Sequence, residues 1–179
     1  MFILYVASHA VQSNWSFYTI FRFNWDEKMI GISLGIVGLL VAIVQGGLIR
    51  YTSPKLGNEK SIYFGMVLYT VSMVLFAFAS QSWMMFAFLI PYCLAGIAGP
   101  ALQSVISAEV LPTEQGEIQG TLTSLMSASA IIGPPLMSTI FYYFTHKEAP
   151  FLFPGAPFIL AAVLMLVATI IAFYSFKKR

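Results

Sequence analysis

Residues 61–108 read SIYFGMVLYTVSMVLFAFASQSWMMFAFLIPYCLAGIAGPALQSVISA, a run of 48 residues without a charged side chain. A helix rises about 1.5 Å per residue, so about 20 mostly apolar residues are needed to cross the roughly 30 Å hydrocarbon layer of a membrane. The run is therefore long enough for two membrane-spanning helices. The polar turn Ser80-Gln81-Ser82-Trp83 predicts the break between them, because tryptophan favours the membrane–water interface.

Charge-free stretches of 21 to 28 residues occur four more times in the chain, and each is long enough for one span. The stretches are continuously apolar rather than alternating, which favours helices over the strands of a membrane barrel. The sequence thus predicts an all-α integral membrane protein with a single domain of six transmembrane helices. The expected spans are about 2–21, 29–49, 61–80, 84–107, 118–143 and 152–175.

The composition excludes several classes of protein. Of the 179 residues, 59% are apolar and 9% are charged, whereas a soluble domain carries about 25% charged residues. This excludes a water-soluble enzyme, a nucleic-acid-binding protein and a disordered protein. The single cysteine, Cys93, allows no disulfide within the chain. The sequence shows neither a nucleophile–base pair nor metal-spaced ligands, so we expect no enzymatic activity, no metal and no cofactor.

Lysine and arginine residues set the expected orientation. Six spans place both termini on one side of the membrane, and the loops and tail on that side carry six of the nine basic residues. Positively charged loops stay in the cytoplasm, so both termini are expected to be cytoplasmic, in a multi-pass protein of the inner cell membrane. The residues that decide this are Arg50, Lys55, Lys60, Lys177, Lys178 and Arg179.

The first span carries a polar stripe. Its polar residues recur at steps of four and three, which is the spacing of one helix face. Polar groups in a membrane need water or partners, because burying them in lipid costs free energy. The stripe therefore predicts the wall of a water-filled cavity, with hydrogen bonding between helices as the alternative. The stripe consists of Tyr5, His9, Gln12, Ser16 and Thr19.

Two later spans add polar residues. Gln103 lies near the end of the fourth span, and Thr121 and Ser124 share a face of the fifth. The fifth span then contains Gly133-Pro134-Pro135, and proline removes a backbone donor and kinks a helix. The candidate cavity-lining residues are Tyr5, His9, Gln12, Trp15, Ser16, Gln103, Thr121 and Ser124.

His9 is the candidate proton site. Transporters driven by protons usually need a titratable group within the membrane. No Asp, Glu, Lys or Arg lies at depth in any predicted span, and His9 is the one histidine inside a span. The unperturbed pKa of histidine is near 6.5, so its charge can switch at physiological pH. Either His9 handles protons, or the coupling acid lies on another polypeptide segment.

Several short motifs occur in order along nearly the whole chain. They are Trp15-x3-Thr19-x2-Arg22-Phe23-x-Trp25, Met29-Ile30-Gly31-x-Ser33-Leu34, Gly57-x-Glu59-Lys60, Pro100-Ala101-Leu102-Gln103, Gln115-Gly116-x2-Gln119-Gly120 and Ile132-Gly133-Pro134. Together they resemble the C-terminal half of the tetracycline/proton antiporter group, in the drug-exporting branch of the major facilitator superfamily. The resemblance implies helices 7 to 12 of a twelve-helix transporter, built as 3+3 inverted repeats, with a central cavity and alternating access.

The implied function is proton-coupled export of drugs or other small molecules. The implied partners are the lipid bilayer, the substrate, protons, and either an N-terminal six-helix half or a second copy in a parallel homodimer. Tetracycline antiporters typically carry a His in helix 8 and an Asp in helix 9, where this chain has Val41 and Tyr69. The alternative is a non-transporting six-helix membrane protein that acts as an assembly or regulatory partner.

Overall fold

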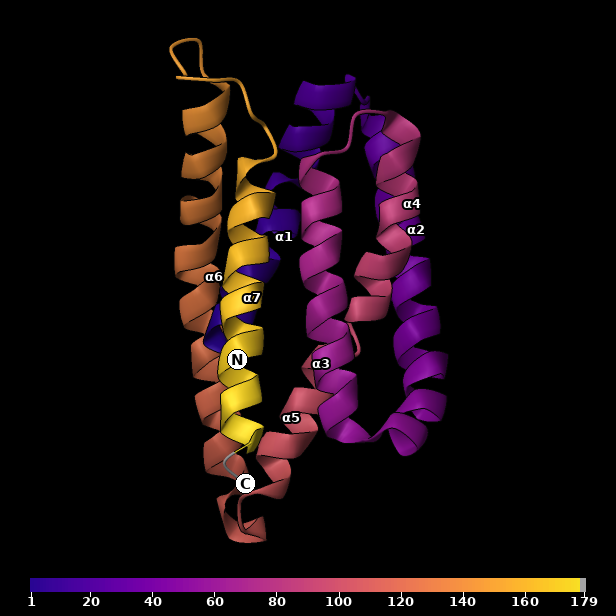
Figure 1. Cartoon of the computed structure of the whole chain (residues 1–179), viewed down its shortest axis with the longest axis vertical. Coiled ribbons are helices and arrows are strands. Elements are labelled where there is room, and N and C mark those ends of the chain that lie inside the picture. Colours follow the sequence, from indigo (N-terminus) through magenta and orange to yellow (C-terminus); the bar gives the residue numbers. More distant parts are fainter. Residues whose placement is uncertain (178–179) are drawn as a thin grey trace.

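The computed structural model describes residues 1–177, except for the side chains of residues 50–56. The described residues form helices, with no strand among them, which confirms the predicted fold class. Figure 1 shows the long helices running side by side along the longest axis of the molecule. In chain order the elements are α1 (Phe2–Phe23), α2 (Glu27–Ile43), the π-helix η1 (Val44–Leu48), α3 (Ile49–Ala77), α4 (Ser82–Ala95), α5 (Ala98–Ala108), the 3-10 helix η2 (Pro112–Glu114), α6 (Gln115–Thr145) and α7 (Ala156–Lys177).

Five helical segments in the described part of the chain are long and apolar enough to cross a membrane. They correspond to the last five predicted spans. Helix α1 has 22 residues, which is a sufficient length, but its polar stripe leaves it less apolar than the others. That α1 crosses the membrane as a sixth span stays a prediction. The five segments are Glu27–Leu48, Gly57–Ala77, Ser82–Ala108, Pro112–Thr145 and Ala156–Lys177.

The two ends of the described chain lie at the same end of the bundle. Met1 and Phe2 line the same pocket as Ser175 and Phe176, as an even number of spans requires. Of the residues that decide the orientation, the side chains of Arg50 and Lys55, together with Lys178 and Arg179, lie outside the described residues. The cytoplasmic location of the termini therefore stays a prediction.

A short local signal separates α1 from α2. Asn24 ends α1 in the left-handed conformation, with φ 52°, which asparagine tolerates better than most residues. Two residues later, a side-chain oxygen of Asp26 accepts a hydrogen bond of 2.8 Å from the backbone N–H of Met29. This cap satisfies one of the donors left free at the start of α2.

The core is an aromatic cluster that joins α1, α3 and α7. The Tyr18 hydroxyl donates a hydrogen bond of 2.7 Å to the backbone oxygen of Phe76. The Tyr18 ring meets the ring of Phe158 edge-on at 4.9 Å between centroids, and all three side chains are fully buried. Aromatic pairs in this geometry add stability beyond the area they bury, so this cluster fixes α1 against the other two helices.

The structure divides the expected span 84–107 into two helices. Helix α4 ends at Ala95 and α5 begins at Ala98, close to Gly96 and Pro100. Helix α3 approaches this break closely because residue 65 is glycine. A Cβ at Gly65 would lie 2.7 Å from the Cβ of Ala98 and 2.9 Å from the backbone oxygen of Ala95. The sequence predicted one continuous span here, with Pro91 and Pro100 as residues that kink a helix.

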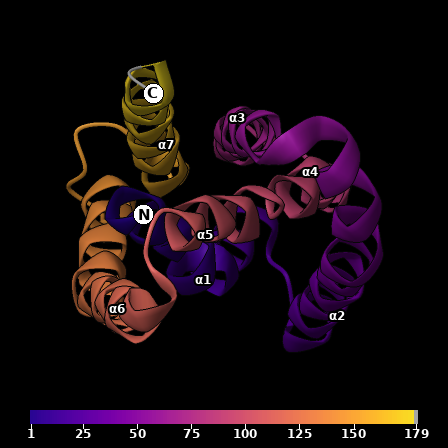
Figure 2. The same cartoon turned by 90° about the horizontal axis from the view of Figure 1, so that it is seen from below.

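A view along the bundle shows which helices are neighbours. Figure 2 shows α1 and α5 between α2 on one side and α6 on the other, with α3 and α7 together across the bundle. Helices α1 and α6 pack against each other, as do α3 and α7. The side of α1 that turns away from α3 and α7 is the side that carries the polar stripe.

Candidate transport surface

The structure places four residues of the stripe on one side of α1. Gln12 is exposed, and Tyr5, His9 and Ser16 are half-buried. The buried residues of α1 form the opposite side, against the aromatic cluster. The amide nitrogen of Gln12 lies 3.5 Å from the hydroxyl of Ser8, its neighbour one turn earlier. Within this side of α1, Gln12 is thus the most open of the four residues.

Trp15 and Thr19 lie in the packed interior instead. Trp15 is 3% exposed, and its indole N–H donates a hydrogen bond of 2.9 Å to the hydroxyl of Ser33 on α2. The Trp15 ring also meets the ring of Phe76 edge-on at 5.3 Å. The hydroxyl of Thr19, a fully buried residue, donates to the backbone oxygen of Trp15 at 2.9 Å. The structure therefore separates these two residues from the exposed side of α1.

His9 contacts α6 at a glycine. A Cβ at Gly133 would lie 2.7 Å from the Cγ of His9, so the imidazole rests on the backbone of α6. Eight residues further along both helices, the rings of Phe17 and Phe141 lie 6.5 Å apart. Both pairs have the same separation in sequence, which shows that α1 and α6 run in the same direction with a constant register.

A polar network joins α5 to α6. The side-chain amide nitrogen of Gln103 donates a hydrogen bond of 3.0 Å to the side-chain oxygen of Gln119. The amide nitrogen of Gln119 donates in turn to the hydroxyl of Ser107 at 3.1 Å, and Gln115 donates to the backbone oxygen of Ser107 at 2.7 Å. The sequence analysis named Gln103 as a site residue but gave its partner Gln119, and Gln115, only as parts of a motif, because their pairing depends on how α5 and α6 pack.

The register of α6 on α1 separates the candidate residues into two groups. Thr121 and Ser124 precede Gly133 by twelve and nine residues, or about 18 and about 14 Å at 1.5 Å per residue. They therefore lie level with the start of α1, near the Gln103–Gln119 pair, and both are exposed. We call Tyr5, His9, Gln12 and Ser16 the α1 stripe, and Gln103, Thr121 and Ser124 the end group.

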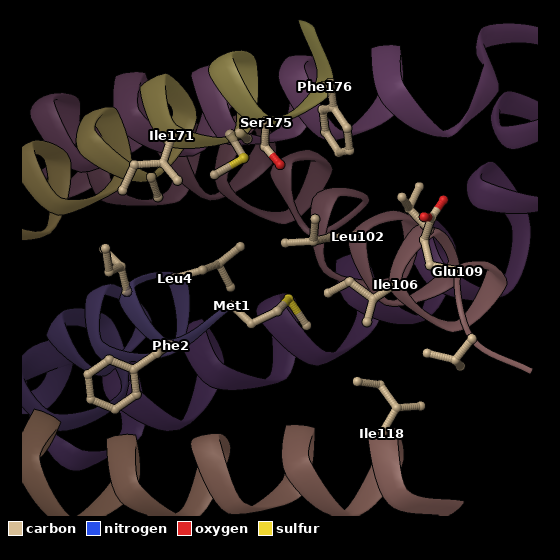
Figure 3. Close-up of a pocket in the computed structure, with 16 residues that line it drawn as sticks. Met1, Phe2, Leu4, Leu102, Ile106, Glu109, Ile118, Ile171, Ser175 and Phe176 are labelled. Carbon is tan, nitrogen blue, oxygen red and sulfur yellow. The ribbon is translucent and has the colours of Figure 1, made fainter. Parts of the chain in front are cut away.

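A pocket of about 580 Å³ opens beside the end group. Its walls are apolar side chains from α1, α3, α5, α6 and α7, with Leu4, Leu102 and Ile171 among them. Figure 3 shows that the carboxylate of Glu109 and the hydroxyl of Ser175 add polar atoms to this lining. The described lining includes none of the eight predicted site residues. Gly96 and Pro100 lie at the break between α4 and α5, just before the α5 residues that line this pocket. They are the nearest sequence feature that could have pointed to it.

The described residues contain no group of three or more His, Cys, Asp or Glu side chains that could hold a metal ion. What the geometry defines is a multi-pass helical membrane protein in which α1 and α6 expose polar side chains between apolar ones.

Comparison with known proteins identifies the family. The family model of the Major Facilitator Superfamily matches residues 1–179, and the chain belongs to this superfamily. The chain is 38% identical over 133 residues to the tetracycline resistance protein, class G, of Vibrio anguillarum, which covers 74% of the chain and 34% of that protein. It is 35% identical over 170 residues to the class E protein of Escherichia coli, which covers 95% of the chain and 41% of that protein.

More distant relatives have other names. The human hippocampus abundant transcript-like protein 1 is 24% identical over 189 residues, which covers 97% of the chain and 37% of that protein. The chain thus spans between 34% and 41% of the length of these three curated relatives. Family membership confirms the predicted resemblance and places the chain among membrane transport proteins rather than enzymes.

Proposed function

We propose that the chain is the C-terminal six-helix half of a proton-coupled transporter that exports drugs or other small molecules by alternating access. The observation that carries the proposal is the α1 stripe, whose polar side chains face outward in a membrane helix. On α7, by contrast, the exposed side chains from Val163 to Phe173 are all apolar. In lipid, an outward polar side costs free energy unless water or another protein meets it.

A second six-helix unit opposite α1 would enclose the stripe in a cavity. The curated relatives are more than twice as long as the part that this chain matches, which supports an N-terminal half as that unit. A second copy in a parallel homodimer is the other arrangement. We infer that the termini lie in the cytoplasm and that the membrane is the inner cell membrane.

The α1 stripe and the end group have different roles in this proposal. The α1 stripe forms the wall of the cavity, where His9 carries the proton and Gln12 and Ser16 bind substrate by hydrogen bonds. The end group lies level with the chain termini and forms the mouth of the cavity on that side. Trp15 holds α1 against α2 rather than lining the cavity. The substrate class is a small organic molecule.

Cysteine accessibility tests the cavity. In a Cys93→Ala background, Gln12→Cys, Ser16→Cys and Ser124→Cys should react with a membrane-impermeant thiol reagent, because water reaches them. Val163→Cys is the control, since Val163 is 53% exposed but lies on the apolar side of α7, and Lys147→Cys reports a loop. Reaction at Lys147→Cys alone would contradict the proposal and favour a non-transporting partner protein.

The proton role of His9 has its own test. In the complete transporter, His9→Gln should abolish export driven by a pH gradient, because glutamine keeps the polarity but cannot take up a proton. The variant protein should remain folded, as judged by its unfolding temperature. Undiminished export by His9→Gln would assign proton coupling to another residue.

Oligomeric state distinguishes the two arrangements of the second unit. Gln12→Cys should form no disulfide-linked pair of chains under mild oxidation if an N-terminal half faces α1. Efficient cross-linking of two copies would instead support the parallel homodimer.

A further inference from the structure

The contact between His9 and Gly133 leaves no room for a side chain on α6. A Cβ at Gly133 would lie 2.7 Å from the Cγ and 2.9 Å from the Cβ of His9. By contrast, a Cβ at Gly120 on the same helix would have no atom within 4 Å. The His9 imidazole therefore requires glycine at position 133, whereas position 120 has room for a side chain.

Two prolines follow Gly133 directly. Pro134 and Pro135 lie inside α6, which continues as a helix across them. Proline has no N–H, so the backbone oxygens of Ala130 and Ile131 lack the donor four residues later that a regular helix would supply. Both oxygens lie within one turn of Gly133. At about 100° per residue, Ala130 lies about 60° from Gly133 around α6, whereas Ile131 lies about 160° away, on the opposite side of the helix. The Ala130 oxygen is therefore the one of the two that lies toward the imidazole.

We propose that Gly133 is a positioning residue that holds the His9 ring near the backbone oxygen of Ala130, so that proton uptake changes the packing of α1 on α6. A neutral imidazole packs on glycine through van der Waals contact. A protonated imidazole donates from both ring nitrogens and needs acceptors, and the backbone oxygen of Ala130 is an acceptor on this side of α6. This inference rests on the proposed role of His9 as the proton carrier.

Other titratable groups on the neighbouring helices lie away from this contact. On α6, Glu117 is sixteen residues before Gly133 and Tyr142 is nine residues after it, which is at least about 13 Å along the axis. Tyr143 and His146 lie still further along, and Tyr174 and Lys177 lie at the end of α7, level with the start of α1. On α1 itself, Tyr5 is one turn from His9. The backbone of α6 at Gly133, which we call the seat, is thus the contact of the His9 ring that the structure defines.

Nuclear magnetic resonance can test the seat without a transport assay, because the chain has two histidines, His9 and His146. In lipid nanodiscs, Gly133→Ala should move the ring resonances of His9 and the pH midpoint of its titration, and leave those of His146 unchanged. Gly120→Ala is the matched control and should change neither. Unchanged His9 resonances in Gly133→Ala would overturn the proposal.

Two further variants guard against simple misfolding. Pro134→Ala restores an N–H without adding atoms against His9, so it should shift the pH midpoint of His9 and leave the resonances of its neutral ring in place. An unchanged midpoint would show that the backbone oxygen of Ala130 does not accept a hydrogen bond from protonated His9. The double variant His9→Ala/Gly133→Ala should recover part of the unfolding temperature lost in Gly133→Ala alone, since the ring contacts are removed while the 2.9 Å contact with the Cβ of residue 9 remains.

Export by the complete transporter separates this inference from the proposed function. Gly133→Ala should shift the pH profile of export, and Gly120→Ala should not. If His9→Gln left export intact, the proton role of His9 would fall and the coupling part of the inference with it, whatever the resonances showed. If His9→Gln abolished export while Gly133→Ala left the pH profile unchanged, the positioning role of Gly133 would be rejected and the proton role of His9 retained.

Discussion

Helices α1 and α7 have the same length, 22 residues each, and pack against each other through Tyr18 and Phe158. Their outward sides nevertheless differ. On α7 the exposed side chains at mid-helix are apolar, whereas α1 exposes Gln12 and half-exposes His9 and Ser16. The length of each helix and its buried side chains follow from the fold. The polarity of the exposed side chains indicates instead what surrounds each helix. The comparison predicts lipid outside α7 and water or a second unit outside α1.

The largest effect is expected where the two helices join. Phe158→Ala removes a fully buried ring and should cost about 3–5 kcal/mol of unfolding free energy, through lost apolar contacts and the cavity left behind. Chemical denaturation in detergent measures this loss. Val163→Ala, on the exposed side of the same helix, should change it little. Equal losses in both variants would show that Tyr18 and Phe158 do not hold α1 to α7.

A charge placed on either outward side sharpens the comparison. Val163→Lys should cost about 2.5–3.5 kcal/mol of membrane insertion free energy, the penalty for lysine at the centre of a lipid-facing helix. Gln12→Lys should cost much less in the complete transporter, because water reaches that side of α1. The fraction of chain inserted into membranes measures both. Equal penalties at the two positions would place lipid outside α1 as well.

The smallest effect is expected at Trp15. Trp15→Phe removes the hydrogen bond to Ser33, which should cost about 0.5–1.5 kcal/mol of unfolding free energy. The hydroxyl of Ser33 keeps its own bond of 2.7 Å to the backbone oxygen of Ile30. Trp83→Phe, at a residue that is 63% exposed, is the control. Reduced substrate affinity in Trp15→Phe with unchanged stability would return Trp15 to the cavity wall.

Hydropathy and charge predicted the helices well but not their irregularities. Four of the five charge-free stretches overlap the five apolar helical segments of the described chain, and the first stretch forms α1. Charge distribution predicts this because placing a charged side chain in lipid costs free energy wherever it lies along a span. The break between α4 and α5 depends instead on backbone geometry and on the close approach of Gly65. A hydropathy pattern does not contain either.

The structure separates the candidate residues of α1 into an outward group, the α1 stripe, and two buried residues, Trp15 and Thr19. At about 100° per residue, Ser16 lies about 20° from Tyr5 around α1, whereas Thr19 and Trp15 lie about 40° and about 80° away in the other direction. Those two residues turn toward the interior, and the packing of α2 and α3 buries them. The separate level of Thr121 and Ser124 follows from the register of α6 on α1, which only the folded structure contains.

The break between α4 and α5 also makes the bundle unequally stiff along its length. On one side of the break, Phe76, Tyr18 and Phe158 fill the space between the helices. On the other side, the apolar pocket of about 580 Å³ leaves α5 unsupported toward α7. We therefore expect the bundle to deform more easily at the end where both termini of the described chain lie. A deformation there compresses empty volume and leaves the aromatic contacts at the opposite end intact.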